Sequence, residues 1–245
     1  MLKYPSLFSE LKVGKKKLKN RICLCATVTN FAQNNRITEP WRNFLLERAR
    51  GGAAMLVTEV IAVDPEAIAQ SSTITGFNQT NEAGFRQIAD DVHEEDSLIV
   101  GQLWHPGRQQ LWHPTKSPIG VSDIPDPYSG TVPHVMKTEE VLRVAESYVN
   151  TAKRLSDCGF DGVELHGAHG YLIMQFLSPA SNNREDMFGG DLEARTLFVR
   201  KIAEGIKEKC RQDFIIGLKM PADEGVPGGV CPDEAARITK RLSKT

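Results

Sequence analysis

The residues best suited to chemistry are two histidines and a tyrosine, His166, His169 and Tyr171, which directly follow an apolar run. The run Val163–Leu165 predicts a buried strand, and the glycines between the polar residues predict a rigid turn. Two ring N–H donors beside a phenol suit a substrate carbonyl that must be polarised and then protonated. Metal binding is disfavoured, because glycines interrupt any helix here and no carboxylate completes a ligand set. We therefore expect no metal.

Two further polar positions have both a structural and a functional interpretation. Gln102 ends an apolar run, and its side chain offers a donor and an acceptor side by side. That pair matches the edge of a flavin pyrimidine or a nucleobase, but loop backbone could satisfy it equally well. Arg184 and Asp186 could pair to pin their loop, or the loop could form a wall of an active site.

Bulk composition excludes several classes of protein. The chain has 245 residues and a formal net charge of −1, which gives no general attraction to nucleic acid or anionic membranes. No apolar run approaches the roughly 20 residues that cross a bilayer, and residues 1–5 contain no signal-peptide core. Five cysteines at irregular spacing predict reduced thiols in the cytoplasm. Cys23 and Cys25 are interpreted as buried, inert thiols rather than zinc ligands.

Alternating strands and helices must position these residues. After a hairpin at Leu11–Leu18, we predict strands at Arg21–Thr27, Ala53–Thr58, Ser97–Leu103, Asp161–Leu165 and Phe214–Lys219. The predicted helices run from Thr38 to Gly51, from Asn81 to about Glu95, from Thr138 to near Gly159, and over Leu172–Leu177, Glu193–Cys210 and Pro232–Leu242. Long loops cover 104–137 and 167–192. Five β/α units of this length favour a parallel sheet with right-handed crossovers.

Five segments, taken in order, resemble the Old Yellow Enzyme family of FMN-dependent NADH:flavin oxidoreductases. Within that family, the chain is most similar to the enoate and 2,4-dienoyl-CoA reductase branch. The segments are Leu18-Lys19-Asn20-Arg21-Ile22, Thr58-Glu59, Gln102-Leu103-Trp104-His105-Pro106-Gly107-Arg108, His166-Gly167-Ala168-His169-Gly170-Tyr171 and Asn183-Arg184-Glu185-Asp186-Met187-Phe188-Gly189-Gly190. The matching region spans residues 5 to about 235.

The resemblance implies an α/β fold of the TIM (β/α)8-barrel family and a role for each site residue. His166 and His169 should hold the oxygen of an α,β-unsaturated carbonyl, and Tyr171 should give a proton to its α-carbon. The cofactor FMN should contact the remaining six positions, which are Ala26, Thr27, Val28, Val60, Gln102 and Lys219. Val60 is expected just after the second strand.

The implied activity is reduction of the C=C bond of α,β-unsaturated carbonyl compounds, with NADH or NADPH as hydride source. The substrate would be an enone, an enoate or a dienoyl thioester. The expected partners therefore include this small molecule but neither nucleic acid nor membrane. The choice of coenzyme and the oligomeric state, a homo-oligomer included, stay open.

The sequence also departs from the family pattern. Ala26-Thr27 replaces Pro-Met, Val28 stands where a threonine or cysteine usually bonds the flavin, and Lys219 replaces an arginine. Glu193-Ala194-Arg195 replaces Glu-Asn-Arg. Five β/α units, where a barrel has eight, predict a C-terminally truncated member: a single partial flavin-binding domain over residues 1–245 without strands 6–8.

Two alternative functions follow from these departures. The chain could be a catalytically inactive truncated paralogue or fragment that acts, if at all, as a binding partner. It could also be an aldolase-like barrel in which Lys219 forms a Schiff base, although that leaves Gln102 and the histidine–tyrosine turn unexplained.

Overall fold

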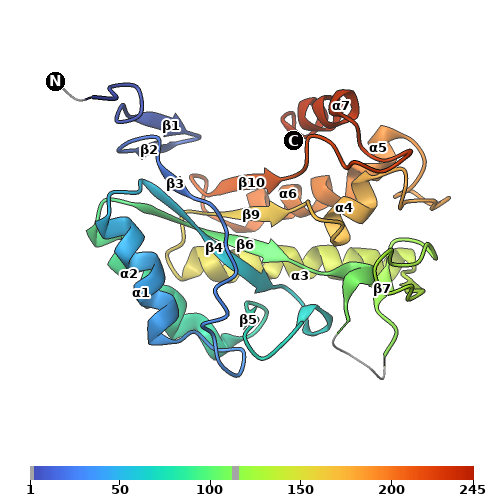
Figure 1. The fold of residues 1–245 in the computed structure, drawn as a ribbon, viewed down its shortest axis with the longest axis horizontal. Coiled ribbons are helices and arrows are strands. Elements are labelled where there is room, and N and C mark those ends of the chain that lie inside the picture. The colour runs from blue at the N-terminus through green and yellow to red at the C-terminus, as the bar shows by residue number, and fades with distance from the viewer. Residues whose placement is uncertain (1–2, 112–115) are drawn as a thin grey trace.

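A parallel sheet forms the centre of the protein in the computed structural model, which describes residues 3–111 and 116–245 (Figure 1). The strand order is β10-β9-β6-β4-β3, and the short β5 also pairs with β4; every pairing is parallel. The strands are β3 (Cys23–Leu24), β4 (Met55–Ala62), β5 (Ile74–Thr75), β6 (Leu98–Trp104), β9 (Gly162–His166) and β10 (Ile215–Lys219). The sheet therefore confirms the predicted α/β class. The described residues do not include Trp112–Thr115, which belong to the predicted loop 104–137. They also do not include residues 1 and 2, which belong to the N-terminal segment 1–5 that contains no signal-peptide core.

Helices follow the strands along the chain. The α-helices are α1 (Glu39–Arg50), α2 (Glu82–Glu94), α3 (Thr138–Asp157), α4 (Leu172–Leu177), α5 (Leu192–Arg195), α6 (Leu197–Lys209) and α7 (Pro232–Leu242). There are also single 3-10 turns, which are η1 (Pro65–Ala67), η2 (Gln79–Asn81) and η3 (Gly107–Gln109). Two small strand pairs of the described chain lie outside the central sheet. They are β1 (Leu11–Val13) with β2 (Lys16–Leu18), and β7 (Ile119–Gly120) with β8 (His134–Val135). None of the described helices combines the length and the apolar character needed to cross a membrane.

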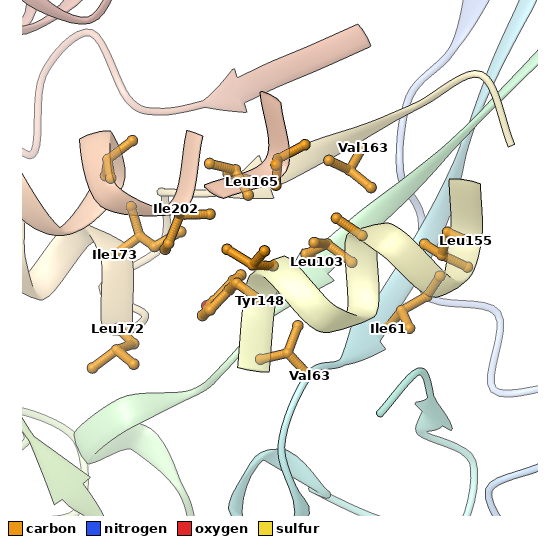
Figure 2. Close-up of a cluster of buried hydrophobic side chains, with 14 of the residues drawn as sticks. Ile61, Val63, Leu103, Tyr148, Leu155, Val163, Leu165, Leu172, Ile173 and Ile202 are labelled. Atoms are coloured by element: carbon orange, nitrogen blue, oxygen red, sulfur yellow. The ribbon is translucent and has the colours of Figure 1, made fainter. Parts of the chain in front are cut away.

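The hydrophobic core lies between one face of the sheet and the helices (Figure 2). Leu103, Val163 and Leu165 project from the strands and are at most 1% exposed. They pack in the same cluster as Tyr148 of α3 and Ile202 of α6. Since successive side chains of a strand point to opposite faces, the residues between them face away from this core. Gln102, Glu164 and His166 therefore lie on the other face of the sheet.

Two predicted strand boundaries were wrong, for local reasons. The first strand is only Cys23–Leu24, because the chain leaves the sheet where the Thr27 hydroxyl hydrogen-bonds to the Cys25 carbonyl (3.3 Å). The second strand continues to Ala62 past a register shift between Val57 and Val60. Val60 therefore lies within β4, paired with β6, and not in a loop.

The predicted helix Glu193–Cys210 is divided at Thr196 into α5 and α6. The Thr196 hydroxyl donates to the carbonyls of Leu192 (2.8 Å) and Glu193 (3.1 Å). Such bonding to the preceding turn bends a helix.

The prediction that Cys23 and Cys25 are buried was also wrong, because both residues are exposed. Their shared face of the strand points away from the helices, whereas Leu24 between them packs against the core. Burial around the sulfur nevertheless raises the pKa of Cys23 to about 11, so this thiol stays protonated at neutral pH.

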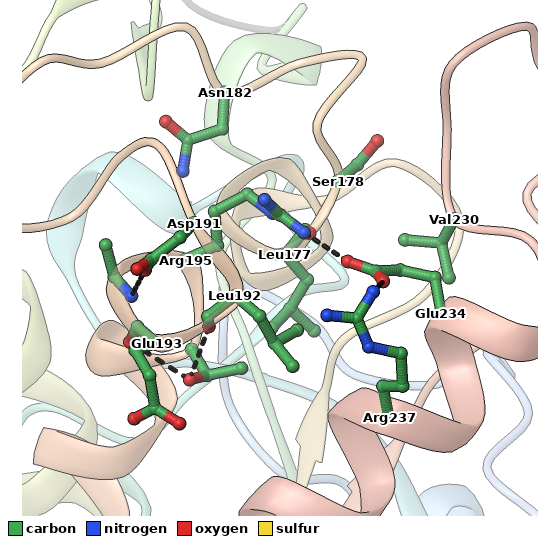
Figure 3. A network of polar contacts seen from close by, with 12 residues as sticks. Leu177, Ser178, Asn182, Asp191, Leu192, Glu193, Arg195, Val230, Glu234 and Arg237 are labelled. Carbon is green, nitrogen blue, oxygen red and sulfur yellow. Dashed lines mark hydrogen bonds and ion pairs between the residues drawn. The ribbon is translucent and has the colours of Figure 1, made fainter.

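A polar network joins the segments that follow β9 and β10 (Figure 3). The Arg195 guanidinium is buried and donates to the carbonyls of Leu177 (3.0 Å) and Gly190 (2.6 Å). It also pairs with Glu234 of α7, which in turn pairs with Arg237 (3.0 Å). Because a buried charge needs such partners, Arg195 ties α7 to the α4–α5 segment.

At the opposite end of the sheet, a buried carboxylate connects three segments. Asp161 accepts from the Ile99 backbone N–H (2.9 Å) and contacts Nε2 of His93 (2.8 Å) and Nζ of Lys16 (3.1 Å). Burial raises the pKa of Asp161, but the bonds with His93, Ile99 and Lys16 together outweigh it, and the pKa lies below its ordinary value.

We expect Leu103→Ala to lower the free energy of unfolding by about 2–5 kcal/mol, because it opens a cavity in the core. Leu142→Ala, on the exposed side of α3, should change it by less than about 0.5 kcal/mol. Urea unfolding of both variants tests this, and similar losses would contradict the proposed location of the core.

We expect Asp161→Asn to destabilise the protein at pH 7 by about 1.5–3 kcal/mol, because it removes a charged acceptor. A lowered folded-state pKa gives stability that is present above the unfolded pKa of about 3.9 and is lost as pH falls through the folded value. The difference from wild type should therefore shrink between pH 7 and pH 3. Asp157→Asn, at a carboxylate 54% exposed, should show little difference at either pH. A difference for Asp161→Asn that stays constant would contradict the assignment.

Candidate active site

One pocket of about 220 Å³ lies at the carboxyl ends of β4, β6, β9 and β10. All nine residues that the sequence predicted for the site line it: Ala26, Thr27, Val28, Val60, Gln102, His166, His169, Tyr171 and Lys219. The remaining lining residues are Glu59, Ala69, Gln70, Ser72, Thr73 and Trp104. The carboxyl ends of parallel strands are where α/β barrels place their chemistry.

The turn after β9 has a backbone that few residue types allow. His169 and Gly170 both have positive φ, +59° and +74°. The positive φ of Gly170 favours glycine, and a Cβ there would also lie 2.4 Å from Nε2 of Gln109 and displace that side chain. A left-handed histidine beside it is uncommon and points to a positioned side chain.

Two glutamines hold this turn against the loop that follows β6. Nε2 of Gln175 donates to the carbonyls of Gly170 (2.7 Å) and Pro106 (3.2 Å), and its Oε1 accepts from the Arg108 N–H (3.3 Å). Nε2 of Gln109 donates to the His169 carbonyl (2.9 Å). Gln175 is 1% exposed, so its three bonds form in a water-poor environment.

The three predicted catalytic rings converge on the pocket. The ring of His166 lies 5.0 Å from that of His169 and 5.0 Å from that of Tyr171, measured between centroids. The Ala168 N–H donates to Nδ1 of His166 (3.3 Å). This bond occupies the lone pair of Nδ1, so the neutral ring carries its proton on Nε2.

Burial controls the protonation of two of these rings. Burial, assisted by His169 and Lys219, lowers the pKa of His166 to about 3, so the ring is neutral at physiological pH. Burial raises the pKa of Tyr171, so the phenol keeps its proton. The site therefore offers a neutral Nε2–H donor beside a protonated tyrosine.

The side chains on the strands fit a flavin ring. The amide of Gln102, 2% exposed, is hydrogen-bonded to the Glu164 carboxylate (2.7 Å) instead of to loop backbone. The half-buried Lys219 ends β10 in register with His166 and brings a cation to the pocket. Val28 is 52% exposed, and its side chain cannot hydrogen-bond. The polar edge of a flavin needs both hydrogen-bond donors and acceptors. The amide of Gln102, the cation of Lys219 and the backbone of Ala26–Val28 together supply them.

Several residues in and around the site were not predicted from the sequence. Glu59 is 4% exposed and accepts from the hydroxyl (2.6 Å) and backbone N–H (3.1 Å) of Thr29. Trp104 packs edge-on against Tyr171, with centroids 5.2 Å apart. Glu164 stands two residues before His166, so strand alternation could have placed it on the same face. Nothing in the sequence signals that residues 69–73 reach the pocket.

Arg184 and Asp186 pair (2.6 Å) and pin their loop, and neither lines the pocket that holds His166 and Tyr171. The guanidinium of Arg184 also donates to the carbonyls of Val121 (3.0 Å) and Met136 (2.6 Å). The hydrogen bonds from Arg184 lower the pKa of Asp186 to about 2.

A second polar cluster brings together Asp64, Glu66 and His105, whose possible ligand atoms lie within 4.8 Å of one another. The Gly107 N–H donates to Nδ1 of His105 (3.0 Å), which leaves the proton of the neutral ring on Nε2. Arg143 already pairs with Asp64 (2.7 Å). A protonated Nε2 and an occupied carboxylate do not favour a metal ion here.

Comparisons with known proteins agree with these observations. Residues 6–244 match the model of the NADH:flavin oxidoreductase / NADH oxidase family. The chain is 35% identical over 248 aligned positions to the NADH oxidase of Thermoanaerobacter brockii, and the alignment covers 100% of this chain and 38% of that protein.

Two solved structures show a similar fold. One, 2-naphthoyl-CoA reductase in complex with 2-naphthoyl-CoA, has a TM-score of 0.93 at 26% identity, covering 98% of this chain and 39% of that one. The other, the Old Yellow Enzyme homologue of Zymomonas mobilis, has a TM-score of 0.84 at 25% identity, covering 98% and 71%.

The parallel half-barrel thus matches part of the (β/α)8 barrel of these structures, as predicted. Since the family model covers nearly the whole chain, the protein belongs to the NADH:flavin oxidoreductase / NADH oxidase family, the Old Yellow Enzyme family that its motifs resemble.

Proposed function

We propose that residues 1–245 form a single flavin-binding domain that reduces the C=C bond of an α,β-unsaturated carbonyl compound with NADH or NADPH. The observation that carries the proposal is one pocket that holds Gln102 and Lys219 beside the rings of His166, His169 and Tyr171. An amide and a cation suit the cofactor, and the rings suit the substrate.

Gln102, Lys219 and Val60, with the backbone of Ala26–Val28, would hold FMN. When bound, FMN supplies hydride transfer from the nicotinamide coenzyme to the β-carbon of the substrate. The positive charge of Lys219 would stabilise negative charge on the reduced ring.

His166 and His169 act on the substrate oxygen. Negative charge grows on this oxygen as the β-carbon gains hydride, and donors placed in advance stabilise it. The neutral His166 presents Nε2–H because Nδ1 is already bonded to the Ala168 N–H. The donor is therefore oriented before the substrate arrives.

Tyr171 donates the proton that the α-carbon needs. Its raised pKa keeps the phenol protonated at neutral pH, as a general acid requires. The packing of Trp104 and His166 against the ring restricts its motion. The solved relative in complex with 2-naphthoyl-CoA supports an unsaturated thioester among the candidate substrates.

We expect the purified chain to bind FMN and to quench its fluorescence. Lys219→Gln should weaken binding about tenfold, because it removes a charge that contributes about 1.4 kcal/mol in a partly buried site. Lys240→Gln, at an exposed position on α7, serves as the control and should bind FMN like wild type. A wild-type chain that leaves FMN fluorescence unchanged would contradict the proposed function.

We expect Tyr171→Phe to slow the reduction of an enone such as 2-cyclohexenone about 10²–10⁴-fold while the coenzyme still reduces bound FMN, because only proton donation is lost. Stopped-flow measurement of the two half-reactions separates these steps. Tyr128→Phe, at a tyrosine 86% exposed, should change neither rate. Equal enone reduction by wild type and Tyr171→Phe would exclude Tyr171 as the proton donor.

A further inference from the structure

A carboxylate lies directly beside the amide that is expected to contact the cofactor. Gln102 and Glu164 are opposite each other in the register of β6 and β9. Their side chains share the face of the sheet that points away from the helices, and Nε2 of Gln102 donates to Oε1 of Glu164 (2.7 Å). None of the functions argued above uses Glu164.

This contact determines the orientation of the Gln102 side-chain amide, that is, whether its NH2 group or its oxygen faces Glu164. An ionised carboxylate only accepts hydrogen bonds, so the NH2 end of the amide must face it. The reversed amide would bring two acceptor oxygens to 2.7 Å, which costs free energy because neither oxygen can donate a proton to the other. The Gln102 backbone N–H also donates to the Thr58 hydroxyl (3.2 Å), which fixes the main chain.

We propose that Glu164 is a positioning residue that holds the Gln102 amide in one orientation. The amide then offers Oε1 and its second N–H to a molecule in the pocket. The part of this inference that concerns FMN rests on the proposed function, whereas the orientation of the amide does not.

Side-chain amide NMR tests the orientation without any flavin. In the full chain labelled with ¹⁵N, the Gln102 NH2 signals are assigned by their loss in Gln102→Leu. We expect one of these protons to be shifted downfield, because it is hydrogen-bonded to the Glu164 carboxylate. In Glu164→Leu, the downfield shift should disappear.

Gln175 is the internal reference, because its NH2 group is bonded to the carbonyls of Gly170 and Pro106 and not to a carboxylate. Its signals should be the same in wild type and Glu164→Leu, which shows that the variant is folded. Glu204→Leu, at an exposed position on α6, is the matched control and should leave the Gln102 signals unchanged. Gln102 signals that are identical in wild type and Glu164→Leu would overturn the proposal.

FMN titration of the same proteins tests the consequence for the cofactor. Glu164→Leu should bind FMN about tenfold more weakly than wild type, and Glu204→Leu should not. Unchanged FMN affinity in Glu164→Leu would overturn the role of the orientation in cofactor binding. A chain that shows the expected Gln102 signals but binds no FMN would instead contradict the proposed function and leave the Gln102–Glu164 pair established.

Discussion

The site depends above all on the register of the parallel strands. β6 and β9 pair Gln102 with Glu164, and β9 and β10 pair His166 with Lys219. Because side chains alternate along a strand, a slip of one residue would turn His166 towards the helices and Leu165 towards the pocket. Burial of Leu103, Val163 and Leu165 against α3 and α6 prevents such a slip. The same hydrophobic packing therefore stabilises the fold and assembles the site.

Burial also determines the protonation states that the proposed chemistry requires. The low pKa of His166 means that the ring acts as a neutral donor, so its role does not depend on a proton gained near neutral pH. Tyr171 stays protonated for the same physical reason, since removing water disfavours its charged form. One environment thus keeps a base uncharged and an acid undissociated.

The sequence predicted the alternation of elements and nine of the fifteen described residues that line the pocket. Apolar runs and glycine signals are local properties, so the strands containing Gln102, His166 and Lys219 could be located from them. The length of β4 could not, because a pairing that resumes after the register shift near Val60 depends on β6 and β5. The Gln102–Glu164 contact was also out of reach, because it depends on the register of two strands about 60 residues apart.

The two glutamine contacts at the turn after β9 have a mechanical consequence. Gln175 and Gln109 join that turn to the loop after β6, so the wall carrying the rings and the wall carrying Trp104 move as one body. The wall formed by residues 69–73 is held by bonds from Asn35 to the carbonyls of Gln70, Ser71 and Thr73, and by exposed bonds from Gln70 and Ser72 to Asn30. Exposed bonds open at lower free energy than buried ones. The bonds to Asn30 should therefore be the first to open at this pocket, while the wall that carries the rings stays in place.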